Sequence, residues 1–198
     1  MGATLPARVR GVRWAALSRG TQTSLPGHPA RSAANAEGAS LSELACLGLA
    51  RPADARDIAA MSRDLIEQGL HWSWTPARVQ HFIGGAESSV VVARREQRIA
   101  AFAIMHFGDE VAHLNLLAVA SEHRRQGLGR RLMHWLTTTA LEAGVFRINL
   151  ELRAHNDGAR RFYESLGFSQ LGVVQGYYQG REAALRMSRQ FARHPTSI

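Results

Sequence analysis

The most constraining stretch of the chain is an apolar run that passes through two glycines into an amphipathic segment. Residues 110–119 (EVAHLNLLAV) precede SEHRRQGLGRRLMHWL, in which Gly127 and Gly129 lie among four arginines. Glycine adopts positive φ and lets a ligand approach the backbone, but a tight strand-to-helix corner also needs it. Backbone N–H groups at such a corner, with the helix dipole behind them, suit a phosphate or pyrophosphate. The stretch alone leaves both interpretations open.

Neither common nucleotide-binding signature is present at this turn. A Walker loop requires GxxxxGK[ST], and a dinucleotide-binding fold requires GxGxxG after its first strand. The sequence here is RRQGLG. The ligand of the turn therefore has to be inferred from the rest of the chain.

Strand-like and helix-like segments alternate along the chain. Apolar runs predict strands, and apolar residues three or four apart predict helices. The predicted strands are 45–50, 88–96, 98–107, 110–119, 147–153, 167–178 and 182–189. The predicted helices are 55–69 with Asp54 as N-cap, 75–84 with Thr75 as N-cap, 129–143 and 157–166. The dipeptide EQ between the second and third strands suggests a hairpin. This order predicts one mixed α/β domain with a central sheet.

Residues 1–43 differ in composition from the predicted domain. They are rich in Ala, Ser, Arg, Gly and Pro and have no sustained period, which indicates a disordered basic extension or linker. Their arginines and scarcity of acids also resemble an organellar transit peptide. We therefore expect a domain over 44–192, followed by a short tail over 193–198.

The positive charge does not indicate a nucleic-acid-binding protein. Of the net charge of +8, residues 1–40 supply +4, from five arginines against Glu37 alone. The remainder is mildly basic, as suits an anionic ligand. A nucleic-acid module would interleave aromatic residues with its arginines, a pattern that we do not find. We expect no nucleic-acid partner.

Two further observations bear on the compartment. No run approaches 18 consecutive apolar residues, so we expect no membrane span. The single cysteine, Cys46, excludes an intramolecular disulfide and fits a reducing compartment, so we expect a cytoplasmic protein. Because Cys46 lies in an apolar run, it is predicted to be part of the core.

Two segments together resemble the GNAT (GCN5-related) N-acetyltransferases. Arg124, Gly127 and Gly129 form RxxGxG after an apolar strand, which resembles motif A of that family. The segment LELRAHNDGARRFYESLGF resembles motif B, a strand followed by an asparagine and a tyrosine-bearing helix. Within the family, AAFAI, LAV, RRQGLGR, LELRAHN, FYESLGF and GYY are most similar to the ribosomal-protein alanine N-acetyltransferases. The resemblance covers about residues 90–189.

The resemblance implies a fold and a co-substrate. The fold would be α/β (α+β), a mixed, mostly antiparallel sheet of about six or seven strands, splayed at the acetyl-CoA site and flanked by about four helices. Acetyl-CoA would be the co-substrate, with no metal. The implied acetyl-CoA-binding residues are Leu117, Ala118, Val119, Arg124, Arg125, Gln126, Gly127, Leu128, Gly129, Arg130 and Asn156. The first three would bind the pantetheine arm through backbone amides, and the arginines would contact the pyrophosphate.

Acetyl transfer from a thioester to an amine needs a neutral amine, a donor for the carbonyl oxygen and a proton for the departing thiolate. The resemblance implies that Tyr163 supplies that proton. Tyr163 lies seven residues after Asn156, which is two helical turns on the same side. A packed aromatic ring and a helix cap are the alternative roles of these two residues.

Glu151 is the candidate general base. In RINLELR the apolar Ile148, Leu150 and Leu152 share one face, so Glu151 projects from the other. A carboxylate with a raised pKa at this position would accept the amine proton through water. The alternative role is a cross-strand ion pair with Arg147 or Arg153.

Glu110, His113 or water alone are the other candidates for the base. For the acceptor, Tyr177 and Tyr178 match the Asn-Tyr-Tyr segment of the ribosomal enzymes and are substrate-binding candidates, with core packing as the alternative. Trp72 and Trp74 are candidates for the opposite wall.

The predicted function is acetyl-CoA-dependent N-acetylation of a primary amine by direct attack in a ternary complex. The acceptor is a small molecule or a protein N-terminal α-amine. The alternative is a non-catalytic domain that binds acetyl-CoA as a sensor. A homodimer is compatible with the sequence but not indicated by it.

Overall fold

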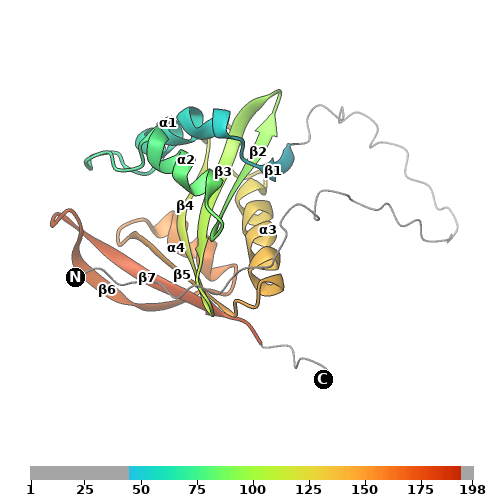
Figure 1. Ribbon diagram of the computed structural model, residues 1–198. Coiled ribbons are helices and arrows are strands. Elements are labelled where there is room, and N and C mark those ends of the chain that lie inside the picture. Colours follow the sequence, from blue (N-terminus) through green and yellow to red (C-terminus); the bar gives the residue numbers. More distant parts are fainter. Residues whose placement is uncertain (1–44, 193–198) are drawn as a thin grey trace, which may run out of the picture.

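The computed structural model describes residues 45–192, which form one twisted sheet flanked by helices (Figure 1). The strands are β1 (Cys46–Leu49), β2 (Ser88–Arg95), β3 (Arg98–Phe107), β4 (Val111–Val119), β5 (Arg147–Arg153), β6 (Ser169–Tyr178) and β7 (Glu182–Gln190). The helices are α1 (Ala55–Leu65), α2 (Pro76–Gly84), α3 (Leu128–Glu142) and α4 (Asp157–Glu164). The sheet order is β1-β2-β3-β4-β5-β7-β6. The predicted α/β fold with a mixed sheet is confirmed.

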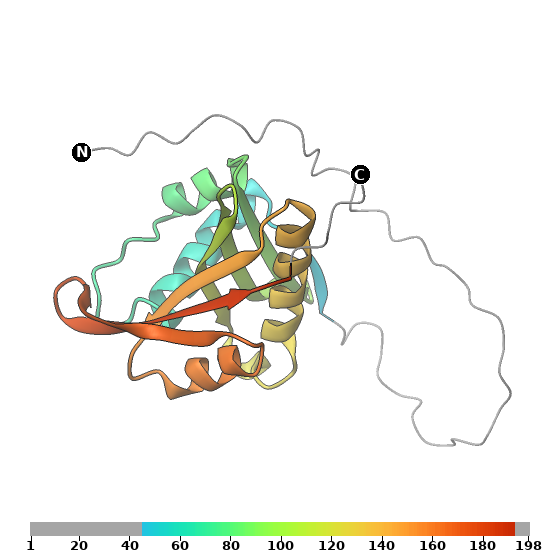
Figure 2. The same cartoon turned by 90° about the horizontal axis from the view of Figure 1, so that it is seen from below.

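All neighbouring strands are antiparallel except β4 and β5, which are parallel. Helices α1 and α2 cover one face of the sheet, and α3 and α4 cover the other (Figures 1 and 2). Two hydrophobic clusters fill these layers. Ile58, Val79 and Phe102 belong to the cluster under α1 and α2, whereas Leu132 and Met187 belong to the one under α3 and α4. The regions predicted as an extension (1–43) and a tail (193–198) lie outside the described residues.

Local signals account for most element boundaries. Thr75 Oγ1 accepts a hydrogen bond from the backbone N–H of Arg78 at 3.4 Å and caps α2 as predicted. The β2–β3 hairpin turns at Glu96 and Gln97, which have φ of 48° and 67°. Positive φ at both central residues matches the twist of a two-residue hairpin.

No helix within residues 45–192 is long and apolar enough to cross a membrane.

Two expectations at the start of the domain are wrong. Asp54 precedes α1 but does not cap it, because its carboxylate accepts hydrogen bonds from the Arg51 backbone and the Arg94 side chain instead. Cys46 is exposed and not part of the core. It lies on β1, the edge strand of the sheet, where an apolar run need not be buried on both faces.

Strand β4 contains an irregularity at Asn115 that changes which face its residues occupy. Ile104 on β3 pairs with Leu116, yet the next residue of β3 pairs with Leu114, so Asn115 is the extra residue of a bulge. Ala112 and Leu114 therefore pack under α3 and α4, while Leu116 and Ala118 pack under α1 and α2. The unbroken alternation of the sequence hides this switch.

The bulge coincides with an opening of the sheet. Strands β4 and β5 pair from Val111 and Arg147 to Leu114 and Leu150. Strand β5 continues beside β7 as far as Arg153, while β4 continues beside β3 as far as Val119. The two parallel strands therefore diverge and leave a cleft between them.

We predict that the core tolerates little loss of volume at the centre of β3. Phe102 is fully buried, so Phe102→Ala should lower the free energy of unfolding by about 3–5 kcal/mol. Leu171, which is exposed on β6, is the matched control, and Leu171→Ala should change that free energy by no more than about 0.5 kcal/mol. Urea denaturation of both variants measures the difference, and equal effects would contradict this assignment of the core.

Candidate functional site

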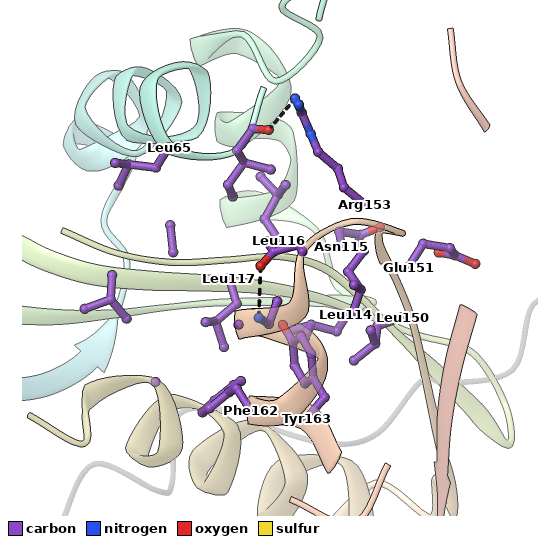
Figure 3. A pocket seen from close by; sticks show the side chains of 18 of the residues that line it. Leu65, Leu114, Asn115, Leu116, Leu117, Leu150, Glu151, Arg153, Phe162 and Tyr163 are labelled. Atoms are coloured by element: carbon purple, nitrogen blue, oxygen red, sulfur yellow. Dashed lines mark hydrogen bonds between the residues drawn. The ribbon is translucent and has the colours of Figure 1, made fainter. Parts of the chain in front are cut away.

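A large cleft lies where β4 and β5 diverge, and residues from both halves of the domain line it (Figure 3). The glycine turn before α3 and the start of α4 form one end. Glu151, Tyr177, Tyr178 and the loop between α1 and α2 form the other. Because the cleft is continuous, a ligand in the glycine turn and a second one beside Glu151 would share one space.

The two glycines of the turn serve different purposes. Gly127 is the N-cap of α3 with φ of 78°, and a Cβ placed there would meet nothing within 4 Å. A Cβ on Gly129 would lie 3.2 Å from Cζ of Phe162 on α4. Gly129 is therefore required for close packing of two helices, whereas Gly127 allows the left-handed turn and leaves space in front of it.

The backbone around Gly127 is arranged to bind an anion. Arg125 also has positive φ, at 64°, so left-handed residues flank Gln126 just before the first N–H groups of α3. Such concave backbone at a helix N-terminus binds phosphate-like groups. Arg124 and Arg130 line the same end of the cleft. Arg124 Nε donates to the Val119 carbonyl at 3.3 Å, and the Arg130 guanidinium donates to the hydroxyl of Ser165, the C-cap of α4, at 3.1 Å.

The structure brings together all but one of the residues expected to bind acetyl-CoA. Those that line the cleft are Leu117, Ala118, Val119, Arg124, Arg125, Gly127, Leu128, Gly129, Arg130 and Asn156. Gln126 is not among the lining residues, because its amide donates to the Glu122 carbonyl at 3.2 Å. Arg161 on α4 does line the cleft, although no sequence pattern singled it out. Arg131 points elsewhere and bonds to the Ala45 carbonyl at 2.9 Å.

Asn156 and Tyr163 lie at the two ends of α4. Asn156 Oδ1 accepts the backbone N–H of Ala159 at 2.9 Å, so it caps the helix. Tyr163 is 7% exposed and packs edge-on against Phe162 and Phe168. It also lines the cleft (Figure 3). Burial, with a smaller contribution from the nearby hydroxyl of Tyr178, raises the pKa of Tyr163 well above the ordinary value, so its hydroxyl keeps its proton.

Phe162 lies near the end of α4, and Leu166 lies just after the helix. Both are only partly buried against the core, and Tyr163 is the buried residue of the helix. Tyr163 therefore packs in the core and also lines the cleft.

Glu151 is held by donors from three strands. His113 Nε2 on β4 lies 3.0 Å from Oε2, Arg186 Nε on β7 lies 3.4 Å from Oε1, and the Tyr177 hydroxyl on β6 also bonds to it. The hydrogen bond from His113 is the main reason that the pKa of Glu151 is lowered. The expected raised pKa is therefore wrong. The ion pair considered as an alternative exists, but its partner is Arg186, the cross-strand neighbour.

The other candidates for a base lie outside the cleft. Glu110 belongs to the turn between β3 and β4 and is not among the lining residues. His113 is not one of them either, and reaches the cleft only through Glu151. Of the three side chains considered as bases, Glu151 alone lines the cleft.

Glu67 organises the loop between α1 and α2, a role that the sequence did not indicate. Its carboxylate is 7% exposed and accepts the N–H and the hydroxyl of Ser73, both at 2.7 Å, and the N–H of Trp74 at 3.3 Å. The Ser62 hydroxyl donates to it at 3.1 Å. This turn ends α1 at Leu65, earlier than the predicted residue 69. Two of the four donors are backbone N–H groups, and the two serine hydroxyls lie five and six residues from Glu67, so no short sequence pattern predicts this turn.

Arg153 ties the same loop to the sheet. Its guanidinium donates to the carbonyls of Ile66 and Gln68 and pairs with Glu182 at 3.1 Å. One of the hydrogen bonds of Arg153 is drawn as a dashed line in Figure 3. The Ile66 contact is 3.0 Å long. Arg153 was expected only as a partner of Glu151, which it does not contact in this arrangement.

The predicted walls of the acceptor end are partly assembled. Trp74 lines the cleft. Its ring centroid lies 5.0 Å from that of the tilted Phe82 ring and 4.3 Å from the Arg78 guanidinium carbon. Tyr177 and Tyr178 line the cleft from the other side, and their ring centroids lie 5.0 Å apart. Trp72 does not line the cleft, and the Arg63 guanidinium lies over its ring.

Comparison with known proteins assigns the family. The sequence model of the acetyltransferase (GNAT) family matches residues 58–168. The chain belongs to this family. The resemblance inferred from the glycine turn and the Asn156–Tyr163 helix is therefore confirmed.

Several GNAT relatives are N-acetyltransferases of protein N-termini. The chain is 40% identical over 94 residues to the [ribosomal protein bS18]-alanine N-acetyltransferase of Escherichia coli K12, an alignment covering 46% of this chain and 64% of that protein. It is 39% identical over 66 residues to the catalytic subunit naa20 of the N-terminal acetyltransferase B complex of Schizosaccharomyces pombe, covering 33% and 37%. The reaction class named for these relatives is the one that the sequence predicts.

Solved structures agree with the GNAT fold. The ribosomal-protein-S18-alanine N-acetyltransferase of Escherichia coli is 30% identical, with a TM-score of 0.64 over 78% of this chain and 99% of that one. Ard1 from Thermoplasma volcanium superposes with a TM-score of 0.68 over 75% and 99%, at 23% identity.

We predict that His113 controls the ionisation of Glu151. His113→Gln removes the hydrogen bond from the imidazole to the carboxylate, so the pKa of Glu151 should rise toward its ordinary value, because that bond is the largest cause of the lowered pKa. A lowered carboxyl pKa stabilises the folded state above the unfolded pKa, and this contribution is lost as pH falls through the folded pKa. The variant should therefore lose less stability on acidification.

Carbon-13 NMR titration of labelled glutamate carboxyls measures the change directly. Arg186→Gln is the comparison variant and should produce the smaller rise, because Arg186 is the weakest of the groups that lower this pKa. A Glu151 pKa that does not move in His113→Gln would contradict the assignment.

Proposed function

We propose that this protein transfers the acetyl group of acetyl-CoA directly to the α-amine at a protein N-terminus, within a ternary complex. The observation that carries the proposal is the continuity of the cleft from the glycine turn to Glu151 and the tyrosine pair. A donor bound along β4 and an amine beside β5 would meet where the strands diverge. The relatives that act on protein N-termini support the choice of acceptor.

The residues of the cleft fit acetyl-CoA. The open space in front of Gly127, with the α3 N-terminus behind it, suits the pyrophosphate, and Arg124 and Arg130 add positive charge. Beyond Leu114 the backbone of β4 faces the cleft and not β5, so it can bond to an extended pantetheine arm. Asn115 Nδ2 is buried at the cleft and has no hydrogen-bond partner within residues 45–192. Such a group favours a polar ligand.

Glu151 and Tyr163 would divide the proton transfers. Glu151 is ionised near neutral pH and attracts the acceptor ammonium. It passes the proton of that ammonium to water, since a carboxylate with a lowered pKa is a weak final proton acceptor. The neutral amine then attacks the thioester carbon, the carbon–sulfur bond breaks, and the nitrogen of the new amide releases its extra proton to water. Tyr163, whose pKa is raised by burial, donates its proton to the departing sulfur and regains a proton from water.

The acceptor would lie between the aromatic walls. Trp74 faces it from the α1–α2 loop, and Tyr177 and Tyr178 from β6. We place the reaction in the cytoplasm, which suits a chain with one cysteine, exposed at Cys46.

A thiol-release assay with acetyl-CoA tests the proposal. The panel should contain peptides beginning with alanine, the same peptides with a blocked N-terminus, and small-molecule amines. Release only with free N-termini supports the proposal. Release only with small amines would move the acceptor to the small-molecule class, and acetyl-CoA binding with no release would favour the sensor role.

We predict that Gly127 matters for acetyl-CoA binding beyond its effect on stability. Gly127 and Gly144 have φ of 78° and 80°, and a Cβ added at either would meet no other atom within 4 Å. Gly127→Ala and Gly144→Ala should therefore each cost about 1–2 kcal/mol of backbone strain. Gly127→Ala alone should weaken acetyl-CoA binding, by about tenfold, because its methyl group would occupy the phosphate space. Isothermal titration calorimetry compares them, and equal affinities would contradict the role of the turn.

Tyr163→Phe is predicted to separate chemistry from binding. Removing the hydroxyl should lower kcat by about a hundredfold or more, the usual contribution of a general acid, while the ring still packs against Phe162 and Phe168. The Kd for acetyl-CoA should remain within about twofold. Stopped-flow turnover and calorimetry measure the two quantities. Unchanged kcat would remove Tyr163 from the reaction.

A further inference from the structure

We propose that Gln179 is a specificity-determining residue for the acceptor. Its side chain joins the α1–α2 loop to the β6–β7 turn, a contact that we call the clasp. The clasp narrows the entrance for the acceptor, so that N-termini with small first residues are favoured. The inference rests on the proposed function, since it concerns the amine that enters the same cleft. Gln179 itself lines the cleft, as do Gln68 and Leu70 of the loop.

The clasp is a reciprocal pair of hydrogen bonds. The backbone N–H of His71 donates to Gln179 Oε1, and Gln179 Nε2 donates to the His71 carbonyl, both at 2.9 Å. One side-chain amide thus satisfies both backbone groups of one residue, as a neighbouring strand would. In Figure 2 the loop after α1 runs alongside the tip of the β6–β7 hairpin.

Gln179 makes this contact from a left-handed position of the β6–β7 turn. Gln179 has φ of 55°, a left-handed conformation that favours glycine, and Gly180 follows with φ of 74°. Glutamine gains nothing in such a turn from its own backbone preference. Glutamine at this position, unlike glycine, supplies the side-chain amide that contacts His71 across 108 positions of the chain.

Gln179 is the outermost of three ties on the loop. Glu67 holds residues 73 and 74 from within, and Arg153 holds the carbonyls of residues 66 and 68 from β5. The middle of the loop, at His71, is held by Gln179 alone among these three. Releasing it would let the middle of the loop move outward while both ends stay anchored, and this would widen the entrance without dismantling Glu151 or Tyr163.

The decisive variant is Gln179→Gly. Glycine relieves the left-handed φ, so the turn should be preserved while both bonds to His71 are lost. Gln97 gives a matched control, because it is also a glutamine at positive φ (67°), here in the two-residue turn between β2 and β3, and it lies outside the cleft. Gln97→Gly should leave the acceptor preference unchanged.

Two peptides measure the preference, one beginning with alanine and the same sequence beginning with cyclohexylalanine. Wild type should favour the alanine peptide in kcat/KM. Gln179→Gly should reduce that preference by about tenfold, as expected for the loss of two exposed hydrogen bonds that resist widening. The relative rise in kcat/KM for the cyclohexylalanine peptide should come from a lower KM for that peptide. The KM for acetyl-CoA should not change.

Amide hydrogen exchange at His71 gives a readout independent of turnover. Exchange should be faster in Gln179→Gly and unchanged in Gln97→Gly. Unchanged exchange in Gln179→Gly would overturn the clasp, and faster exchange with an unchanged peptide preference would overturn its role in selection. Wild-type protein that releases no thiol with any peptide would instead overturn the proposed function, whatever the exchange shows.

Discussion

The bulge at Asn115 is the constraint on which the rest of the site depends. One extra residue in β4 reverses the faces of Leu116 and Ala118 relative to Leu114, and both sets are buried because each face of the sheet carries helices. Beyond that point β4 and β5 no longer share hydrogen bonds, and backbone that would be satisfied by a strand becomes available to a ligand. The glycine turn and the start of α4 border the opening from one side, and Glu151 borders it from the other. The cleft is therefore a consequence of strand geometry more than of any loop.

The sequence predicted the features whose causes are local. Thr75 followed by Pro76 marks a helix start, EQ between two apolar runs marks a hairpin, and Asn156 marks the cap of α4. Each depends on residues within four positions of one another. The alternation in RINLELR also placed Glu151 on the face opposite the core, since the period of a strand is fixed by its backbone. Family resemblance then supplied the order of the two motifs, which local rules do not give.

Features with distant or backbone partners could not be predicted. The bulge is hidden because the sequence alternates without interruption through Asn115. The lowered pKa of Glu151 depends chiefly on His113, which is distant in sequence and is placed beside it only by the parallel pairing of β4 and β5. Glu67 is buried among two backbone N–H groups and two serine hydroxyls, and this set of donors forms no recognisable sequence pattern. The exposure of Cys46 depends on β1 being an edge strand, which is a property of the whole sheet.

The contacts around the acceptor end join residues that are far apart in the sequence. This separation affects the order in which parts of the protein fold during synthesis. The glycine turn and α3 are built from one continuous segment, so they can form early during synthesis. Arg153 reaches back to Ile66 over 87 positions, and Gln179 reaches back to His71 over 108. Such non-local contacts form late, because the loop closure must precede the gain from the contact. A nascent chain would thus acquire its donor-binding corner before its acceptor wall, and become selective only when its last strands have left the ribosome.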